Sequence, residues 1–152
     1  CNVFMANEPL AGKRMVKITE RRTKRDWALF LADIARSYPE AEAITLVMDN
    51  LNTHKPGSLY ETFTPQEAKR LWDRFEFVYT PKHGSWLNMA EIELNVLIRQ
   101  CLNRRIPRME TVAAEAQAWQ HLRNNQNATI NWQFTTGNAR VKLKRLYPTL
   151  EV

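Results

Sequence analysis

The chain has 152 residues, of which 44% are hydrophobic and 25% are charged. This composition is typical of a globular protein, and the length suits one domain with one hydrophobic core. No apolar run approaches the roughly 20 residues that a membrane helix requires, so we expect a soluble protein. The first residues lack the basic leader of a signal peptide, and the expected location is therefore the cytoplasm.

The basic residues are unevenly distributed along the chain. Residues 1–98 hold 13 Lys and Arg against 13 Asp and Glu, whereas residues 99–152 hold 9 against 3. The formal net charge of +6 therefore comes from the last third of the chain. A basic surface is consistent with nucleic acid, with anionic lipid or with simple solubility, so charge favours a nucleic-acid partner without excluding the others.

The first half of the chain predicts two strands, a helix and a third strand. The strand-like segments Val3–Met5 and Met15–Thr19 flank a Pro and a Gly, which predicts a hairpin. Thr23 can cap a helix whose apolar residues recur at helical spacing, and Tyr38–Pro39 ends it. The apolar, β-branched run Ile44–Met48 then predicts a buried strand.

Polar residues follow this third strand directly. Asp49 and Asn50 end the apolar run, and Pro56 and Gly57 add turn chemistry. A carboxylate at the end of a buried strand lies at the edge of the sheet, where it can take part in catalysis or metal binding. The alternative is a strand-end turn, because Asp and Asn side chains bond their own backbone in turns. His54, which lies between, has either a structural or a site role.

The second half of the chain predicts helices around a fourth strand. Thr64–Glu67 has the pattern of a capping box with Pro at the first helical position, and the strand Phe75–Tyr79 follows that helix. The pattern is helical from Asn88 to about Arg105 and again from residue 109 to about residue 123. The order strand, strand, helix, strand, helix, strand, helix, helix predicts an α/β domain with a mixed sheet.

Glu91 is the second candidate acid. It lies on one side of its predicted helix with Asn88 and Asn95, at positions i, i+3 and i+7. Asp49 and Glu91 offer the hard oxygen ligands of a divalent metal site, provided that they converge from their two elements. Glu93 competes with Glu91, because residues two positions apart on a helix face different ways. A solvated helix residue is the alternative interpretation of Glu91.

Two stretches of the chain resemble a known family. Asp49 and Asn50 with His54, and then residues 79–91 (YTPKHGSWLNMAE), are similar to the second and third acidic motifs of bacterial insertion-sequence transposases of the IS630 type, kin of the Tc1/mariner elements. The resemblance implies a ribonuclease H-like catalytic domain whose Asp, Asp, Glu triad binds two Mg²⁺ or Mn²⁺ ions and cuts and rejoins transposon ends. Carried over by position, Asp49 would be the second acid and Glu91 the third.

The start of the chain departs from the pattern of that family. In the family the first Asp lies on the first, central strand of the sheet, upstream of the hairpin, and residues 1–20 offer no acid at a strand end. The resemblance therefore implies a ribonuclease H-like mixed sheet that is flanked by helices and lacks its first strand. We expect one domain over residues 1–152, with a partial core in 1–106 and a helical, basic extension in 107–152. Unpaired strand edges would make such a fragment dimerise, borrow a strand or aggregate.

Further polar residues lie near the two motifs. Lys82, His83 and His54 could contact phosphate or orient a water, and Asn50 and Asn88 could add neutral oxygens near the metals. With two acids in place of three, we expect weak metal binding. The basic side chains expected to contact DNA, for which an ordinary solvated face is the alternative, are Arg104, Arg105, Arg108, Lys142, Lys144 and Arg145.

Three functions are consistent with these residues. The first is the catalytic domain of a DNA transposase, inactive as a fragment if the first acid is lacking, which works in the bacterial cytoplasm at the nucleoid. Its partners would be the double-stranded DNA of transposon ends and target, and a second copy or a full-length transposase, with no membrane. The second is a non-catalytic remnant that binds DNA or pairs with a transposase. The third is a nuclease unrelated to transposition.

Overall fold

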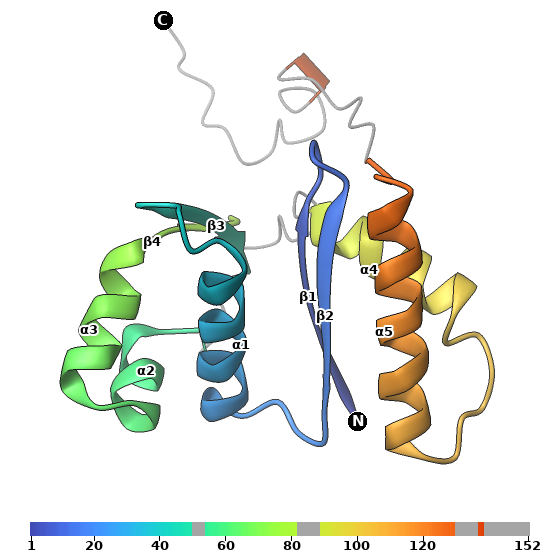
Figure 1. The fold of residues 1–152 in the computed structure, drawn as a ribbon, viewed down its shortest axis with the longest axis horizontal. Helices are drawn as coiled ribbons and strands as arrows, with labels where there is room; N and C mark the ends of the chain where they lie inside the picture. Colours follow the sequence, from blue (N-terminus) through green and yellow to red (C-terminus); the bar gives the residue numbers. More distant parts are fainter. Residues whose placement is uncertain (50–53, 82–88, 130–136, 139–152) are drawn as a thin grey trace, which may run out of the picture.

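The computed structural model describes residues 1–49, 54–81, 89–129 and 137–138. These residues form an α/β fold, as the sequence predicts (Figure 1). No helix in the described part of the chain is long and apolar enough to cross a membrane. The elements in chain order are β1 (Asn2–Glu8), β2 (Lys13–Thr19), α1 (Lys24–Ser37), β3 (Ile44–Met48), α2 (Pro56–Thr62), α3 (Pro65–Arg74), β4 (Phe75–Tyr79), α4 (Met89–Gln100) and α5 (Met109–Asn125).

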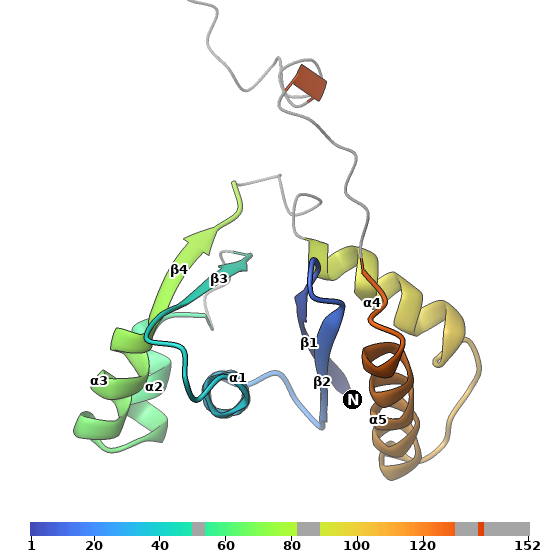
Figure 2. The ribbon, with the colours of Figure 1, turned by 45° about the horizontal axis from the view of Figure 1, so that its top comes forward.

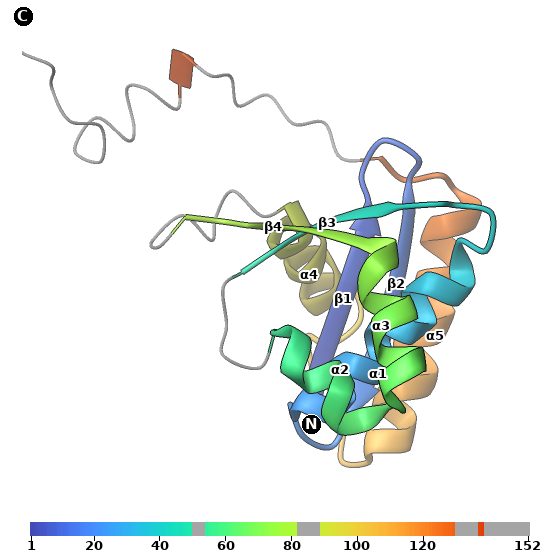
Figure 3. The same cartoon turned by 90° about the vertical axis from the view of Figure 1, so that its left-hand side faces the viewer.

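The strands form two separate two-stranded sheets in place of the single mixed sheet that we expected. β1 and β2 pair antiparallel, with Asn2 opposite Thr19. β3 and β4 pair parallel, with Met48 opposite Tyr79. Among the described residues no backbone hydrogen bond joins one sheet to the other. The two sheets stand apart on either side of α1 (Figure 2), and β3 and β4 cross the direction of β1 and β2 (Figure 3).

α1 supplies much of the core between the two sheets. It begins at a capping box between Thr23 and Asp26 and ends at Tyr38, as the sequence predicts. Its apolar residues occur at helical spacing, so one face is buried against both sheets and against α2 and α3. The buried cluster around α1 contains Phe4, Trp27, Ala28, Phe30, Leu31, Ile34, Ala35, Met48, Leu59, Ala68 and Phe75.

A second cluster lies on the other face of the β1–β2 sheet. There Val16 packs with Leu97 of α4 and with Ala116 and Trp119 of α5. Because side chains alternate between the faces of a strand, Phe4 of β1 belongs to the first cluster while its neighbours Val3 and Met5 pack on the second.

The outer edge of β2 is capped by side chains of α5. The Arg14 N–H donates to Asn124 Oδ1 at 2.8 Å, and the Val16 N–H donates to Gln120 Oε1 at 2.7 Å. In return Asn124 Nδ2 donates to the Arg14 carbonyl at 3.0 Å, and Gln117 Nε2 donates to the Val16 carbonyl at 2.7 Å. α5 thus provides the hydrogen bonds that a further strand would otherwise supply.

Residues 56–62 form a helix where the sequence suggested a turn. Pro56 occupies the first turn of α2, a position where proline's missing N–H costs no helical hydrogen bond. Leu59 is buried against the core cluster around α1, and this tertiary contact stabilises a helix too short to form alone. The Pro56 and Gly57 pair is therefore a helix start.

β3 is covered on one face only, so the prediction of a buried strand was wrong. Its side chains Ile44, Leu46 and Met48 pack on the core, whereas Val47 is 50% exposed. Val78, directly opposite on β4, is 42% exposed. The helices α1 to α3 cover a single face of this sheet, which leaves the Val47 side open.

The helix predicted from residue 88 to about residue 105 is shorter in the structure, where α4 ends at Gln100.

Arg74, at the end of α3, fixes the end of α1. Its guanidinium donates hydrogen bonds to the carbonyls of Ala35 (3.1 Å), Tyr38 (2.6 Å) and Ala41 (3.0 Å). We predict that Arg74→Met lowers the free energy of unfolding by about 1–3 kcal/mol, because three partly buried carbonyls lose their donor. Urea denaturation followed by circular dichroism measures this change.

The control for this prediction is Arg70→Met, one turn earlier on α3. Arg70 is exposed, so its replacement should change the unfolding free energy by no more than about 0.5 kcal/mol. Equal effects of the two substitutions would show that Arg74 does not hold α1 in this way.

Candidate active site

β3 and β4 end side by side, which brings the residues that follow them together. Met48 is opposite Tyr79 in a parallel pair, so the next residues, Asp49 and Thr80, are neighbours. The Thr80 N–H donates to the Met48 carbonyl at 2.9 Å, and Thr80 Oγ1 donates to Asp49 Oδ1 at 3.0 Å. The second carboxylate oxygen of Asp49 has no hydrogen-bond partner among the described residues. The fold thus fixes one oxygen of this acid, and the described residues leave the other without a partner.

His54 lies next to Asp49. Its Nδ1 is 3.4 Å from the Asp49 carbonyl oxygen, and its ring stacks on Trp27 with centroids 5.3 Å apart and planes 14° apart. Burial lowers the pKa of His54 from its ordinary value, although the contacts with Asp49 act in the opposite direction. The imidazole is therefore neutral at neutral pH. Its Nε2 is buried and has no partner within the described ranges.

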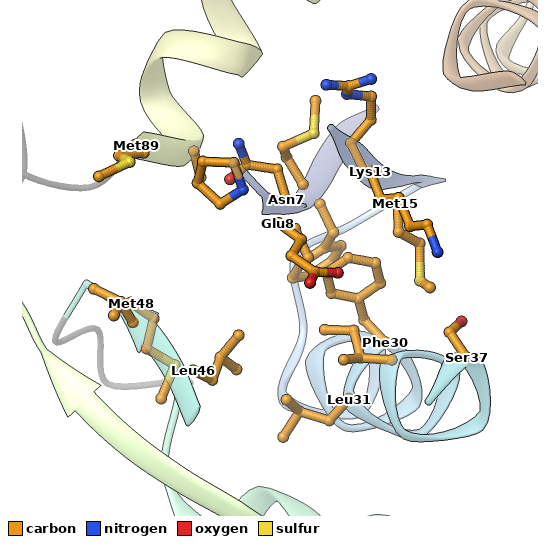
Figure 4. A pocket seen from close by; sticks show the side chains of 18 of the residues that line it. Asn7, Glu8, Lys13, Met15, Phe30, Leu31, Ser37, Leu46, Met48 and Met89 are labelled. Atoms are coloured by element: carbon orange, nitrogen blue, oxygen red, sulfur yellow. The ribbon is translucent and has the colours of Figure 1, made fainter. Parts of the chain in front are cut away.

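The first turn of α4 approaches the same place. Met89 and Ala90 line a cavity of about 750 Å³ together with Asp49 and His54. Figure 4 shows Met89 and Met48 on the same side of this cavity. Glu91 follows Ala90 directly and is exposed, and no ion-pair partner is found for it in the part of the chain that the structure describes. The strand end with Asp49 and the helix start before Glu91 thus share one cavity.

Glu93 is held in a buried ion network away from solvent. Its side chain is 1% exposed, and its Oε1 lies 2.9 Å from Arg14 Nε and 2.7 Å from Arg123 Nε. Burial lowers the pKa of the Arg14 guanidinium, and Glu93 opposes that shift. A carboxylate enclosed by two guanidinium groups is not free to bind a metal, whereas Glu91 is exposed two positions earlier. Glu91 is the available acid in this turn of α4.

The structure describes only part of the predicted site. Arg105 and Arg108 follow α4 and are exposed, while Arg104 is also exposed but pairs with Glu115 of α5. Seven further predicted residues lie outside the described residues: Asn50, Lys82, His83, Asn88, Lys142, Lys144 and Arg145.

Thr80 and Trp27 contribute to the site although the sequence did not indicate these roles. Thr80 is the residue that holds the Asp49 carboxylate. It could have been found from the strand pattern, because the residue after β4 must lie beside the residue after β3 in a parallel pair. Trp27, expected only in the core, also forms the wall against which His54 packs.

The acids near this edge are of the type that binds a hard divalent cation. Carboxylate oxygens, such as those of Asp49 at this edge and of the exposed Glu91 on α4, are the ligand type that Mg²⁺ and Mn²⁺ prefer, but Glu91 is not among the residues that line the cavity. No group of three or more His, Cys, Asp or Glu within the described residues could hold a metal.

A family model for DDE superfamily endonucleases matches residues 1–113. The chain belongs to this family. No curated protein and no solved structure matches it. The matched region of this DDE endonuclease includes Asp49 and Glu91 and ends within α5. The family is that of transposase-type nuclease domains, which implies DNA as the partner and divalent metals as the usual cofactors.

Proposed function

We propose that this DDE endonuclease domain is the C-terminal part of an IS630-type transposase catalytic domain with a ribonuclease H-like fold. The reaction would be the cleavage of DNA phosphodiesters at transposon ends and their transfer to target DNA. The observation that supports this proposal is the single cavity shared by Asp49, held by Thr80 at the end of β3, and the first turn of α4 before Glu91. Residues 1–152 would form one domain, with the helical, basic extension after residue 106.

Asp49 and Glu91 would hold the divalent metal in this site. When bound, such an ion activates the attacking oxygen and stabilises the leaving oxygen of the phosphodiester. Thr80 orients Asp49 by its hydrogen bond. With its Nδ1–H directed at the Asp49 carbonyl, a neutral His54 would offer the buried Nε2 as an acceptor for a water molecule. Asn50, Lys82, His83 and Asn88 remain predicted supporting residues.

The proposed DNA contacts lie after α4 and near the end of the chain. Arg105 and Arg108 are exposed and have no ion-pair partner in the described ranges, so both can contact phosphates. Arg104 can do so if it exchanges Glu115 for a phosphate. Lys142, Lys144 and Arg145 remain predicted contacts. Transposon ends and target are the proposed DNA partners, bound by a dimer or by a pair with a full-length transposase.

Binding of Mn²⁺, followed by the electron paramagnetic resonance signal of the free ion, tests the two acids. We expect weak binding by the parent chain, and Asp49→Ala or Glu91→Ala should each raise the dissociation constant at least about tenfold, since each removes a charged ligand. Glu110→Ala is the matched control, because Glu110 is likewise an exposed acid in the first turn of a helix. Unchanged binding in the Asp49 and Glu91 variants would refute the proposed site.

A DNA-binding remnant without chemistry is the second candidate, favoured by the exposed Arg105 and Arg108. Nicking and joining of duplex DNA in Mn²⁺, lost on Asp49→Ala, would support the transposase. Salt-sensitive DNA binding without nicking, unaffected by Asp49→Ala, would support the remnant. Cleavage without strand joining would instead indicate a nuclease unrelated to transposition.

A further inference from the structure

The loop between β2 and α1, together with the first turn of α1, carries a dense group of cations. Four of the five positions 21–25 are basic, although residues 1–98 as a whole hold equal numbers of basic and acidic residues. All four side chains are exposed. We call them the α1 basic cluster: Arg21, Arg22, Lys24 and Arg25. The balanced charge of the first two thirds of the chain conceals this local excess.

The protein itself neutralises little of this charge. Lys24 pairs with Glu61 at 3.2 Å, and both side chains are more than half exposed, so the pair contributes little. The three arginines of the α1 basic cluster have no ion-pair partner among the described residues. The carboxylate of Asp26 is engaged by Thr23, whose N–H and hydroxyl both donate to it. The cluster therefore retains most of its positive charge for a ligand.

The α1 basic cluster stands where positive charge is unfavourable for a helix. The N-terminus of an α-helix carries a partial positive charge, so acids are favoured in its first turn and cations are disfavoured. Lys24 and Arg25 are the first two residues of α1, and Arg22 directly precedes the N-cap Thr23. Helix stability therefore does not account for the cluster. Such a departure from local preference is expected at a functional surface.

The backbone that carries the cluster is held in place. Thr19 Oγ1 donates to the carbonyl of Arg21 at 2.6 Å. In the capping box the Asp26 N–H donates to Thr23 Oγ1 at 3.1 Å. Groups that are already ordered lose less entropy when they bind. The cluster is thus arranged in advance for a ligand with several negative charges.

The cluster also lies beside the candidate active site. Trp27, two positions after Arg25, stacks on His54, and His54 Nδ1 is 3.4 Å from the Asp49 carbonyl oxygen. Burial is the main cause that lowers the pKa of His54, and the nearby charge of Arg22 acts in the same direction. A ligand held at the start of α1 would therefore extend toward Asp49.

Further exposed cations lie at the same end of the molecule. The loop between β2 and α1 and the start of α5 are near one another in all three views (Figure 1, Figure 2 and Figure 3). Arg108 is the N-cap residue of α5, and Arg105 lies in the segment before it. Two distant parts of the sequence thus contribute to one basic surface. Duplex DNA, which carries phosphates at regular short intervals, can contact both parts at once.

We propose that the α1 basic cluster is a phosphate-binding surface for duplex DNA, which together with Arg105 and Arg108 holds the DNA beside Asp49. Duplex DNA is the partner that the family of this chain implies. Phosphate contacts would position the duplex without reading its sequence. The inference deepens the proposed function, because it concerns the DNA that the candidate site would cut, but its test requires no cleavage.

The double variant Arg22→Gln/Arg25→Gln tests the proposal. Its binding to a short fluorescein-labelled duplex of arbitrary sequence is followed by fluorescence anisotropy in EDTA, between about 50 and 200 mM NaCl. We expect at least about tenfold weaker binding than by the parent chain at the lower salt concentration. The slope of log K against log salt should fall in magnitude by about 2, since each lost phosphate contact removes about 0.9.

Lys69→Gln/Arg70→Gln on α3 is the matched control. Both side chains are exposed, and the double substitution lowers the net charge by the same amount. This variant should keep the affinity of the parent within about threefold, because distant exposed charges are screened by salt. Equal losses in the two double variants would overturn the proposal, since total charge alone would then explain the binding.

Urea denaturation separates the loss of a DNA contact from the loss of the fold. Removing Arg22 and Arg25 takes unfavourable charge away from the N-terminus of α1, so the urea midpoint should equal or exceed that of the parent. A lower midpoint, an unchanged salt slope, or no binding by the folded parent at low salt would overturn the proposal. Because the assay contains no divalent metal, binding through the cluster without any nicking by the parent in Mn²⁺ would refute only the proposed nuclease function.

Discussion

Replacing Glu93 by alanine is expected to lower the free energy of unfolding by about 3–5 kcal/mol, the usual cost of removing one partner of a buried ion network. The Arg14 side chain is 1% exposed and that of Arg123 is 16% exposed, so Arg14 would keep its charge without a counter-ion and without water. Arg123 can turn toward solvent, but Arg14 cannot. Urea denaturation at neutral pH, followed by circular dichroism, measures the loss.

Glu91→Ala is the matched control on the same helix. Glu91 is exposed, so its replacement should change the unfolding free energy by no more than about 0.5 kcal/mol. Glu93→Gln keeps the shape of the side chain and part of its hydrogen bonding, and we expect an intermediate loss. If Glu93→Ala were as mild as Glu91→Ala, the orientation of α4 that buries one acid and exposes the other would be wrong.

Trp27→Ala is expected to destabilise the protein by about 3–5 kcal/mol, as large-to-small changes at buried aromatic residues do. Trp27 is 3% exposed and packs between His54, at 5.3 Å, and Phe77, at 6.2 Å between ring centroids. Its removal would leave a cavity between α1 and β4 and would take away the wall behind His54. Urea denaturation again provides the measurement.

Trp72→Ala is the comparison for this second substitution. Trp72 is only partly buried and stacks on Phe77 with centroids 4.7 Å apart, so its loss removes less buried surface. We expect a smaller effect than at Trp27. The opposite ranking would mean that the centre of the core does not lie at the start of α1, and the position of His54 would then lack its support.

Both substitutions concern the frame that holds the proposed site. The Glu93 network joins α4 to β2 and α5, and so sets the orientation of the helix that carries Glu91. Trp27 joins α1 to His54 and to β4, next to Asp49. The geometry of the two acids therefore depends on residues that would not themselves touch metal or DNA.

Local signals in the sequence were sufficient to predict much of the secondary structure. Thr23 and Thr64 cap the helices that follow them, and the strands Ile44–Met48 and Phe75–Tyr79 have the predicted bounds. These features depend on neighbouring residues, because capping and side-chain alternation act over a few positions. The same signals place Asp49 directly after a strand.

Tertiary contacts decided what local patterns leave open. These contacts divide the strands into two sheets and bury Leu59, which stabilises α2. They also bring Thr80 to its hydrogen bond with Asp49, 31 positions earlier in the sequence. Helical periodicity showed that Glu91 and Glu93 face different ways, but the positions of Arg14 and Arg123 determine which of them is buried. A buried carboxylate needs charged partners that only the folded chain brings together.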